Sequence, residues 1–399
     1  MLNLSLFARI AKEFGTPVYV YKENKIREAL GLLRKNINSL IFYAMKANNN
    51  PEILKILLRE GISGIDAVSP EEITLALKAG FKPKQIVFTG NNITDEETDF
   101  AVNKKVRLNI DSLSRLEKLG KKYGGSEIWV RINSSIGAGH HSHCITGGPE
   151  SKFGIWYTET GRIKRLAKKY GVKIVGLHQH IGSQILELKI FLRAMEALLG
   201  VAEKFPDLKY LDFGGGLGVP YRPEEKPLDV KRLGEEISKR FKNFCRSYGR
   251  KLTLILEPGR YLVAEAGNLL TRVNTIKKNP DGRIFVGVDT GFNHLDRPAR
   301  YGSYHEIVNI SNPHGRKEKV DVVGNLCESG DKFATQREIS HVREGDLLVI
   351  KNAGAYGYSM ASNYNLRAKP AEVLVEPDGK VRLIRRREAF KDLLLKGGG

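Results

Sequence analysis

The chain has 399 residues, of which 41% are hydrophobic and 28% are charged, a composition typical of globular proteins. This length favours two domains over one, and no apolar run approaches the roughly 20 residues that a membrane-spanning helix needs. The N-terminal segment 1–14 lacks the charged start, apolar core and cleavage site of a signal peptide, and it predicts a short amphipathic helix. We therefore expect a cytoplasmic protein.

The net charge of +20 and the three cysteines narrow the function classes further. Lys and Arg are spread along the whole chain and alternate with acids on predicted helix faces, which favours a solvated surface over nucleic-acid binding. The odd, sparse set of cysteines fits a reducing compartment. The run that holds His140, His141, His143 and Cys144 has no distant partner pair, so we expect no metal site there.

In chain order, the apolar run 17–21 predicts a strand, and a helix is expected near 23–35. The pattern then alternates between strand and helix as far as residue 257. Helical periodicity marks stretches such as 51–61 and 69–80, which open with Pro or Ser and close on Gly. Eight apolar, β-branched runs predict strands over 40–44, 64–67, 85–88, 106–110, 127–132, 173–178, 208–213 and 252–256.

Eight strands that alternate with helices predict parallel pairing and a closed (β/α)8 barrel. An open doubly wound sheet is the alternative, because periodicity alone does not show closure. After residue 260, short runs separated by Gly, Asn, Pro and Asp predict an all-β domain. We expect the barrel to span 23–275 and the β-rich domain to combine 1–22 with 276–399, the strand at 17–21 being donated to the latter.

Active sites of such barrels lie at the carboxyl ends of the strands. Polar side chains or glycines follow several of the predicted strands: Lys46, Asp66, Arg131, Asn133, His178, His180, Gly214, Gly215, Gly216 and Glu257. Polar residues at the ends of several strands indicate a site more strongly than any one of them alone.

Lys46 and Glu257 carry the most specific chemistry of this set. Lys46 enters an Asn-rich turn, where desolvation would ease loss of its proton and allow it to form a Schiff base. A carboxylate at Glu257 beside a pyridine nitrogen would keep that nitrogen protonated and make the ring an electron sink. The alternatives are a surface lysine and a surface ion pair.

Other segments suit a phosphate and a planar ring. The glycines 214–216 follow the seventh strand, at the usual phosphate site of barrels, and allow close approach of backbone N–H groups. Arg260 suits a phosphate or a carboxylate. His180 could stack on a ring, and the hydroxyl of Ser183 could bind phosphate. The alternatives are a flexible turn and hydrogen-bonded structural histidines.

Two segments of the β-rich region also hold reactive groups. Cys327, with Glu328 and Asp331, could provide a proton donor beside a carboxylate. Tyr356 and Tyr358 lie among glycines, where a phenol could reach a phosphate. The alternatives are a buried structural cysteine and a β-turn with packed rings.

Taken together, eight segments resemble the fold-type III pyridoxal-phosphate decarboxylases, and within them the branch that acts on diaminopimelate. They are YAMKAN, GAGHHSHCITGGPESKFGI, HQHIGSQ, LDFGGGLGVPY, EPGRYLV, RPARYGSYHEI, CESGD and KNAGAYGYSMASNYN, in the family's order over nearly the whole chain. The resemblance implies an alanine-racemase-like architecture and pyridoxal phosphate as cofactor. It also implies a homodimer, in which CESGD of one subunit completes the barrel site of the other, and conversion of meso-diaminopimelate to lysine and carbon dioxide.

The resemblance also implies a role for each matching residue. Lys46 would carry the cofactor, and Cys327 would protonate the carbanion after carbon dioxide leaves. The residues implied to hold the cofactor are Lys46, His180, Ser183, Gly216, Glu257, Gly259, Arg260 and Tyr356. Those implied to hold the substrate are Arg260, Arg297, Tyr301, Glu328 and Tyr356.

The substrate end of the site bears on specificity. A substrate that ends in both an ammonium and a carboxylate needs both charges opposite it, which Arg260, Arg297 and Glu328 supply. Decarboxylases of ornithine, arginine or a carrier-bound amino acid remain alternatives. A racemase would need a cation at the pyridine nitrogen, which Glu257 opposes, and a cofactor-binding regulatory protein would lack the second domain.

Three positions depart from the family pattern. Ser134 and Asn325 stand where proline is expected, and Met45 stands where a smaller β-branched residue is usual. None removes a proposed catalytic group, but they leave loop geometry, and hence substrate preference, open.

Overall fold

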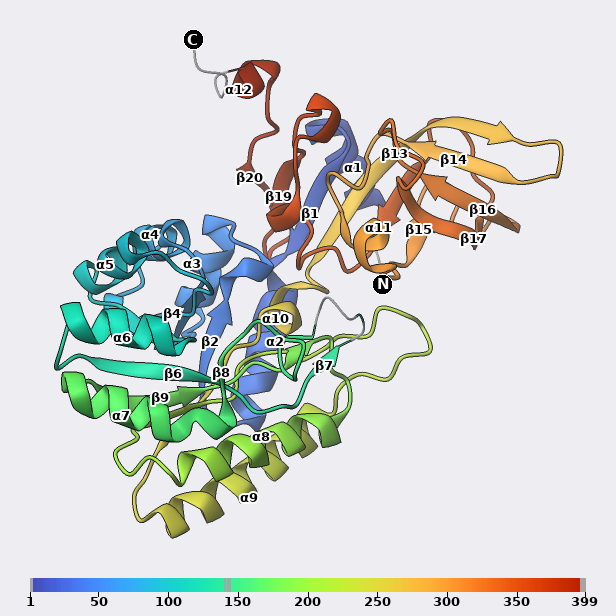
Figure 1. The fold of residues 1–399 in the computed structure, drawn as a ribbon. Helices are drawn as coiled ribbons and strands as arrows, with labels where there is room; N and C mark the ends of the chain where they lie inside the picture. The colour runs from blue at the N-terminus through green and yellow to red at the C-terminus, as the bar shows by residue number, and fades with distance from the viewer. Residues whose placement is uncertain (1–2, 140, 142–144, 395–399) are drawn as a thin grey trace. The chain divides into compact units, whose positions relative to one another are not determined.

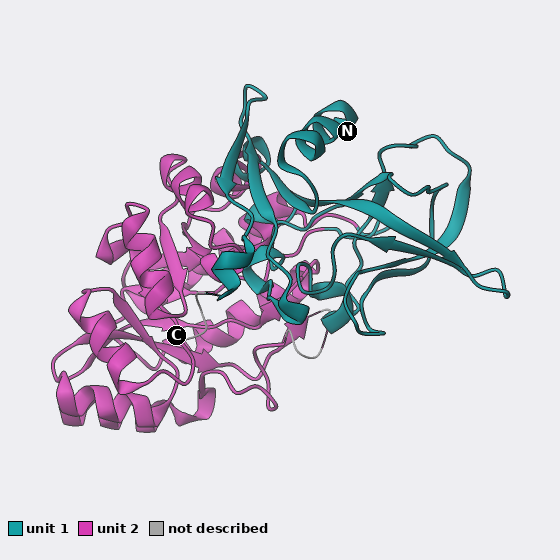
Figure 2. Cartoon of the chain, turned by 90° about the horizontal axis from the view of Figure 1, so that it is seen from above, with its two compact units in different colours: residues 1–26, 220–225, 262–399 teal, residues 27–219, 226–261 magenta. Residues whose placement is uncertain are grey.

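The computed structural model describes residues 3–139, 141 and 145–394 (Figure 1). The metal interpretation considered for His140, His143 and Cys144 lies outside the described residues. The chain divides into two compact units (Figure 2). One comprises residues 27–219 and 226–261, and the other comprises residues 1–26, 220–225 and 262–399.

The larger unit contains a closed parallel barrel. Its eight strands are β2 (Leu40–Ala44), β3 (Gly64–Ala67), β4 (Ile86–Phe88), β5 (Arg107–Ile110), β6 (Glu127–Asn133), β9 (Lys173–His178), β11 (Tyr210–Asp212) and β12 (Thr253–Leu256). The order β5-β4-β3-β2-β12-β11-β9-β6 is closed by pairing of β5 with β6. The predicted barrel is therefore confirmed, and each strand lies within two residues of its predicted range at either end.

Helices follow the barrel strands, as the periodicity predicts. They are α2 (Glu23–Asn36), which precedes β2, and then α3 (Pro51–Arg59), α4 (Pro70–Lys78), α5 (Asp95–Asn103), α6 (Leu113–Lys122), α7 (Thr160–Tyr170), α8 (Leu188–Ala202) and α9 (Val230–Tyr248). Side chains of Asn50, Ser69, Thr94 and Ser112 accept hydrogen bonds from the first turns of α3 to α6. Ser69 is the start signal that the sequence predicts for α4, and Pro51, the first residue of α3, follows the Asn50 cap directly.

Large apolar side chains fill the barrel interior. Phe42, Val87, Trp129, Val175 and Ile255 form one buried cluster. Such a filled interior leaves no pore, so polar groups can converge only at the ends of the barrel. Register sets which groups meet at the carboxyl end, because Arg131 pairs with His178 across β6 and β9, and His178 pairs with Asp212 across β9 and β11.

The second unit is built on a nine-stranded sheet of β1 (Val18–Lys22), β13 (Gly267–Lys278), β14 (Ile284–Val288), β15 (Ile307–Asn309), β16 (Lys317–Val323), β17 (Lys332–Ser340), β18 (Leu347–Ile350), β19 (Ala371–Val375) and β20 (Val381–Arg385). The early strand β1 lies between β13 and β19, antiparallel to the first and parallel to the second. Helix α1 (Leu4–Phe14) packs on this sheet, since Phe7 and Ile10 share a buried cluster with Val18 and Val373.

Short elements complete the described chain: β7 (Ala138–Gly139), β8 (Ile155–Trp156), β10 (Gly182–Ser183), α10 (Arg260–Val263), α11 (Arg297–Tyr301) and α12 (Phe390–Leu394). The β-rich unit resumes at Leu262, fourteen residues before the start expected at 276. The physical reason is β13, which pairs with β1, β14 and β18 of that unit. Among the described residues, no helix is long and apolar enough to span a bilayer.

Candidate active site

Lys46 lies two residues beyond the end of β2, in a 3-10 turn formed by Met45–Ala47. Its Nζ is 3.6 Å from Oδ2 of Asp66, and the lysine side chain is 36% exposed whereas that of Asp66 is 1% exposed. The register of β2 with β3 explains the contact, because Ala44 pairs with Asp66. The desolvation of Lys46 stays a prediction, and the structure adds the carboxylate of Asp66 beside the lysine amine.

The Asn-rich turn after Lys46 is structural. Asn48 is buried, and its side-chain oxygen accepts a hydrogen bond from the backbone of Asn50 at 3.0 Å. Asn50 caps α3, and the hydroxyl of Tyr43 donates to the carbonyl of Asn48 at 2.9 Å. Met45 is fully buried, so its larger side chain at this position packs into the core. These contacts hold the backbone on both sides of Lys46.

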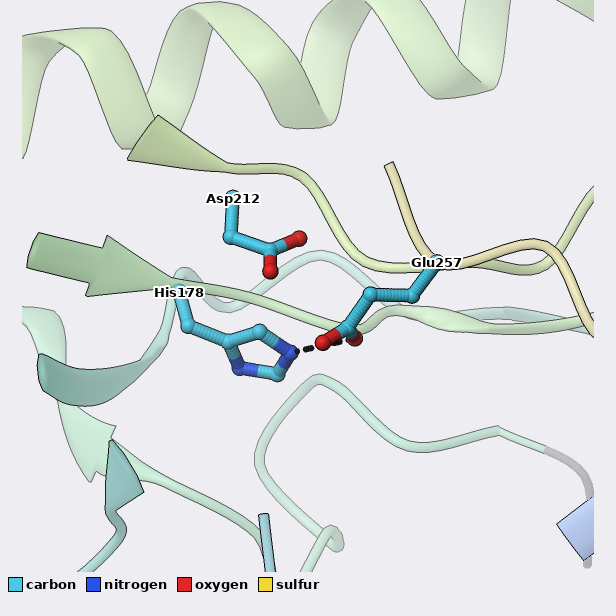
Figure 3. A group of neighbouring side chains, drawn as sticks. All are labelled: His178, Asp212 and Glu257. Carbon is cyan, nitrogen blue, oxygen red and sulfur yellow. Dashed lines mark hydrogen bonds and ion pairs between the residues drawn. The ribbon is translucent and has the colours of Figure 1, made fainter. Parts of the chain in front are cut away.

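Glu257, His178 and Asp212 form a buried cluster at the ends of three neighbouring strands (Figure 3). Nε2 of His178 lies 2.9 Å from Oε2 of Glu257. Oδ1 of Asp212 accepts a hydrogen bond from the backbone N–H of Gly214 at 2.8 Å. Neither His178 Nδ1, Asp212 Oδ2 nor Glu257 Oε1 has a hydrogen-bond partner in the structure, although all three are buried. Buried polar atoms of this kind indicate a ligand site.

Charges in this cluster are unequally distributed. Burial and the neighbouring carboxylate of Glu257 raise the pKa of Asp212 well above its usual value. Burial also raises the pKa of Glu257, but His178 and Lys46 outweigh it, so that the pKa of Glu257 lies below its usual value. Two adjacent buried carboxyl groups cannot both ionise at low cost. These opposite shifts favour the proton on Asp212 and the negative charge on Glu257.

Asp66 and His180 complete the electrostatics of the barrel end. Burial and Glu257 raise the pKa of Asp66 to about 7, against the opposing effect of Lys46. Burial, together with Lys46 and Arg131, holds the pKa of His180 well below its usual value. His180 Nδ1 accepts a hydrogen bond from the backbone N–H of Gly215 at 3.1 Å. This residue is therefore a neutral imidazole with its proton on Nε2.

The turn after β11 requires glycine at successive positions. A Cβ on Gly214 would lie 2.2 Å from the carbonyl oxygen of Gln179, and a Cβ on Gly215 would lie 2.2 Å from that of Glu257. Gly216 has φ +100°, a conformation that L-residues rarely adopt. Gly259 is similarly confined, since its Cβ would lie 2.9 Å from the carbonyl oxygen of Ala44. The glycines bring the ends of β2, β9, β11 and β12 close together.

Arg260 and Ser183 meet beside this turn. Arg260 is 5% exposed, and its Nη2 and Nε donate to Oγ of Ser183 at 2.9 and 3.3 Å. A buried guanidinium and a hydroxyl next to a glycine turn are the donors that a phosphate or carboxylate requires. The sequence placed both residues here, and the structure brings them into contact.

Ser134 replaces an expected proline without disturbing the barrel end. Its Oγ donates to Oε1 of Gln179 at 3.0 Å, and Gln179 Nε2 donates to the carbonyl of Ala194 at 2.8 Å. Gln179 lies between His178 and His180 in the chain. Ser134 therefore supports the segment that carries both histidines. Asn133 is also structural, because its amide bonds to the backbone of Gly148 at 3.0 Å.

In the β-rich unit, the expected pairing of Cys327 with Asp331 is not seen. Asp331 is buried, and its carboxylate accepts backbone hydrogen bonds from Phe292 and Leu326 at 2.7 and 2.8 Å. It shapes the loop, while Cys327 and Glu328 are exposed. The backbone N–H of Asn325 donates to Thr290 at 3.1 Å, a bond that proline at this position could not make.

The remaining predicted residues also lie in the β-rich unit. Arg297 and Tyr301 are the two ends of α11, and Arg297 is only 1% exposed. Tyr356 has φ +56°, which is unusual for an aromatic residue. Tyr358 is part of a different contact, with its ring edge against Tyr19.

Asp212 is the residue of the cluster that the sequence reasoning did not single out. The signal was present, since Asp212 is a charged residue at the end of an apolar strand, directly before the glycine turn. Its raised pKa depends on the closeness of Glu257, which only the fold supplies.

The donor set of the barrel fits a pyridoxal phosphate group. A lysine amine, a buried anionic carboxylate and a neutral imidazole lie with a glycine turn and a Ser183–Arg260 pair at one barrel end. His178, Asp212 and Glu257 could also hold a cation, because their ligand atoms lie within 4.8 Å of one another. The raised pKa of Asp212 and the His178–Glu257 hydrogen bond fit that use less well.

Comparison with known proteins agrees with this interpretation. Residues 23–264 match the family described as pyridoxal-dependent decarboxylase, pyridoxal binding domain. The diaminopimelate decarboxylase of Methanothermobacter thermautotrophicus is 49% identical over 96% of this chain and 92% of its own length. That of Aquifex aeolicus is 40% identical over 96% and 91%. The Helicobacter pylori diaminopimelate decarboxylase, crystallised with L-lysine, superposes with a TM-score of 0.89 at 37% identity, covering 98% of both chains.

Proposed function

Since the chain belongs to the pyridoxal-dependent decarboxylases, and within them to the diaminopimelate decarboxylases, we propose that it converts meso-diaminopimelate to lysine and carbon dioxide. The observation that carries this proposal is the buried Glu257, whose pKa is lowered by His178 and Lys46 despite its burial. An anionic carboxylate at that place suits a protonated pyridine nitrogen, which a decarboxylase needs and a racemase avoids.

Bound pyridoxal phosphate supplies a protonated ring that accepts the electrons of the breaking carbon–carbon bond. Lys46 would hold the aldehyde carbon of the cofactor through Nζ, and Glu257 would accept a hydrogen bond from the protonated ring nitrogen, which keeps that nitrogen protonated. His180 would lie against the ring as a neutral imidazole, which leaves the positive charge on the ring nitrogen. Ser183, Gly216, Gly259, Arg260 and Tyr356 would hold the cofactor, largely at its phosphate.

Cys327 would return a proton to the reacting carbon from its Sγ. Its exposure supports a site that is completed by a second subunit, because a proton donor to a carbanion must be shielded from water. Exposed Tyr364 and Leu366, at 44% and 61%, lie beside it, and Cys327 N–H bonds to Asn365 at 2.7 Å. Exposed apolar groups around a reactive residue are typical of an interface. The protein would thus be a homodimer with shared sites.

A mixing experiment tests the shared site. Lys46→Ala and Cys327→Ala should each be inactive alone. Subunit exchange between the two should restore up to about a quarter of wild-type activity, since half of the dimers are mixed and each has one intact site. Complete lack of complementation, with exchange verified by mass, would place Lys46 and Cys327 of one site on the same chain.

The substrate end distinguishes diaminopimelate from simpler diamino acids. Arg260 and Arg297 would bind the carboxylate that is not lost, Glu328 would bind the adjacent ammonium, and Tyr301 and Tyr356 would line the site. Burying a charged group without a partner is costly. Ornithine has no second carboxylate to pair with these arginines, so it would be a poor substrate.

The free thiols of Cys245 and Cys327 support a cytoplasmic location.

Product analysis is the direct test. The purified protein is incubated with pyridoxal phosphate and meso-diaminopimelate, and lysine and carbon dioxide are quantified. Equal amounts of both are expected. If neither forms while ornithine or arginine is decarboxylated, the substrate assignment is wrong and the decarboxylase assignment stands.

A further inference from the structure

Arg297 is held within the β-rich unit by contacts in two directions. Its Nη1 lies 2.9 Å from Nε2 of His305, and its guanidinium carbon lies 4.4 Å from the ring centroid of Tyr221. Tyr221 also contacts His305, with ring centroids 5.2 Å apart and an interplanar angle of 77°. His305 is fully buried, and Arg297 is 1% exposed. The hydrogen bond to His305 and the stacking on the Tyr221 ring together hold the guanidinium in place.

The hydrogen bonds determine the tautomer of His305. An arginine can only donate, so Nε2 of His305 must be the acceptor and carry no proton. The proton is then on Nδ1, which donates to the carbonyl oxygen of Lys351 at 2.7 Å. His305 therefore connects a backbone carbonyl to the guanidinium, and each ring nitrogen has a different task.

The sheet fixes His305 in this orientation. Strand β15 begins two residues after His305 and pairs with β18, with Ile307 opposite Ile350. The ladder continues beyond the strands, because Lys351 N–H donates to the carbonyl of Glu306 at 2.9 Å. Tyr221 is anchored by a different bond, since Asn352 Nδ2 donates to the carbonyl of Pro220 at 3.1 Å. Both partners of Arg297 are thus tied to the end of β18.

We propose that His305 is a positioning residue that sets the guanidinium of Arg297 for the second carboxylate of the substrate, and so sets specificity for a diamino dicarboxylic acid. This inference rests on the proposed function, because it takes Arg297 as a substrate-binding residue. A long cationic side chain otherwise loses rotamer freedom when it binds, which weakens binding. His305 and Tyr221 remove that freedom before the substrate arrives.

Two substitutions separate the tasks of His305. His305→Gln keeps an acceptor at the position of Nε2 and loses the donor to Lys351. His305→Asn keeps a donor at the position of Nδ1 and loses the acceptor for Arg297. We expect His305→Asn to raise KM for meso-diaminopimelate roughly 10- to 100-fold with kcat changed less than about threefold, as expected for loss of one hydrogen bond to a charged group. His305→Gln should recover most of the binding.

Inhibition by two amines provides a readout that does not depend on turnover of the substrate. Lysine has the distal carboxylate, and 1,5-diaminopentane lacks it. His305→Asn should weaken lysine inhibition by the same factor as the rise in KM, and should leave inhibition by 1,5-diaminopentane unchanged. Thermal unfolding of both variants controls for loss of fold.

The outcomes separate the two proposals. If His305→Asn and His305→Gln weaken lysine inhibition equally, or if inhibition by both amines weakens together, His305 has only a structural role. If Arg297→Lys raises KM for meso-diaminopimelate while His305→Asn has no effect, the positioning inference fails and the assigned role of Arg297 stands. If Arg297→Lys also leaves KM unchanged, Arg297 does not bind substrate and the proposed substrate end is wrong.

Discussion

Replacing Gly215 by alanine tests whether the turn after β11 is built for a cofactor. The added Cβ would lie 2.2 Å from the carbonyl oxygen of Glu257 and 3.7 Å from Cε1 of His180. The backbone N–H of Gly215 also donates to His180 at 3.1 Å. The added methyl group would therefore displace Glu257, His180 and the glycine turn at 214–216 together.

The size of the effect follows from the clash. Real Cβ atoms stay at least 3.0 Å from other heavy atoms, so the turn and the end of β12 must separate from 2.2 Å by 0.8 Å or more. Overpacking of this kind costs about 1–3 kcal/mol of unfolding free energy. A displacement of about 1 Å at an active site lowers turnover about 100-fold. We therefore expect cofactor affinity to fall at least tenfold and turnover to fall further.

The assay combines cofactor titration, followed by visible absorbance, with thermal unfolding. Gly200→Ala is the matched control, because Gly200 lies in α8 and a Cβ there meets nothing within 4 Å. That control should bind cofactor as the wild type does. Its free energy of unfolding should rise by about 0.5–1 kcal/mol, as expected when alanine replaces glycine within a helix. If Gly215→Ala binds cofactor with unchanged affinity, the turn does not form the cofactor site.

Three further substitutions test the charges of the barrel end. Lys46→Ala should lose covalent attachment, so that borohydride no longer fixes a cofactor mass on the chain; retention of that mass would mean that another lysine carries the cofactor. Glu257→Ala should keep cofactor but lose turnover by roughly 100-fold or more, and full activity would refute the electron-sink argument. The pKa of Asp66 is raised to about 7, so its contribution to stability is complete below pH 4 and is lost as pH rises through 7. The cofactor-free Asp66→Asn variant should therefore gain unfolding free energy relative to the wild type between pH 5 and pH 8, by about 2.7 kcal/mol for the two pH units between 5 and 7; urea unfolding at both pH values measures it, and parallel changes would contradict the charge assignment.

The fold was largely predictable because local signals and long-range packing agree. Strands such as Leu40–Ala44 and Lys173–His178 are apolar runs bounded by turn residues, and helices such as α3 begin with an Asn cap and a proline. Closure of the barrel could not be read from periodicity, since it depends on the pairing of β5 with β6. The domain boundary was also hard to place. The local sequence of β13 indicates a strand, but it does not show whether that strand pairs within the barrel or within the β-rich unit.

The site was predictable as a set of residues but not as a set of contacts. Lys46, His180 and Glu257 stand at strand ends, where a barrel collects them. The sequence suggested that Asp331 lies beside Cys327, but the carboxylate of Asp331 is used by backbone N–H groups of its own loop and of Phe292. Which atom a carboxylate meets depends on loop geometry, which residue type and spacing do not specify.

The ionisation of Glu257 shows what the fold adds to residue identity. Three carboxyl groups, Asp66, Asp212 and Glu257, lie buried at one end of the barrel, and burial alone would raise the pKa of each. Their mutual repulsion means that the protein can hold one full negative charge there more easily than three. His178 Nε2 lies within hydrogen-bond distance of Glu257, at 2.9 Å, and Lys46 adds positive charge, so the pKa of Glu257 is lowered while that of Asp212 is raised. Because a pyridine nitrogen needs an anionic partner to stay protonated, the raised pKa of Asp212 supports the electron sink by favouring the negative charge on Glu257.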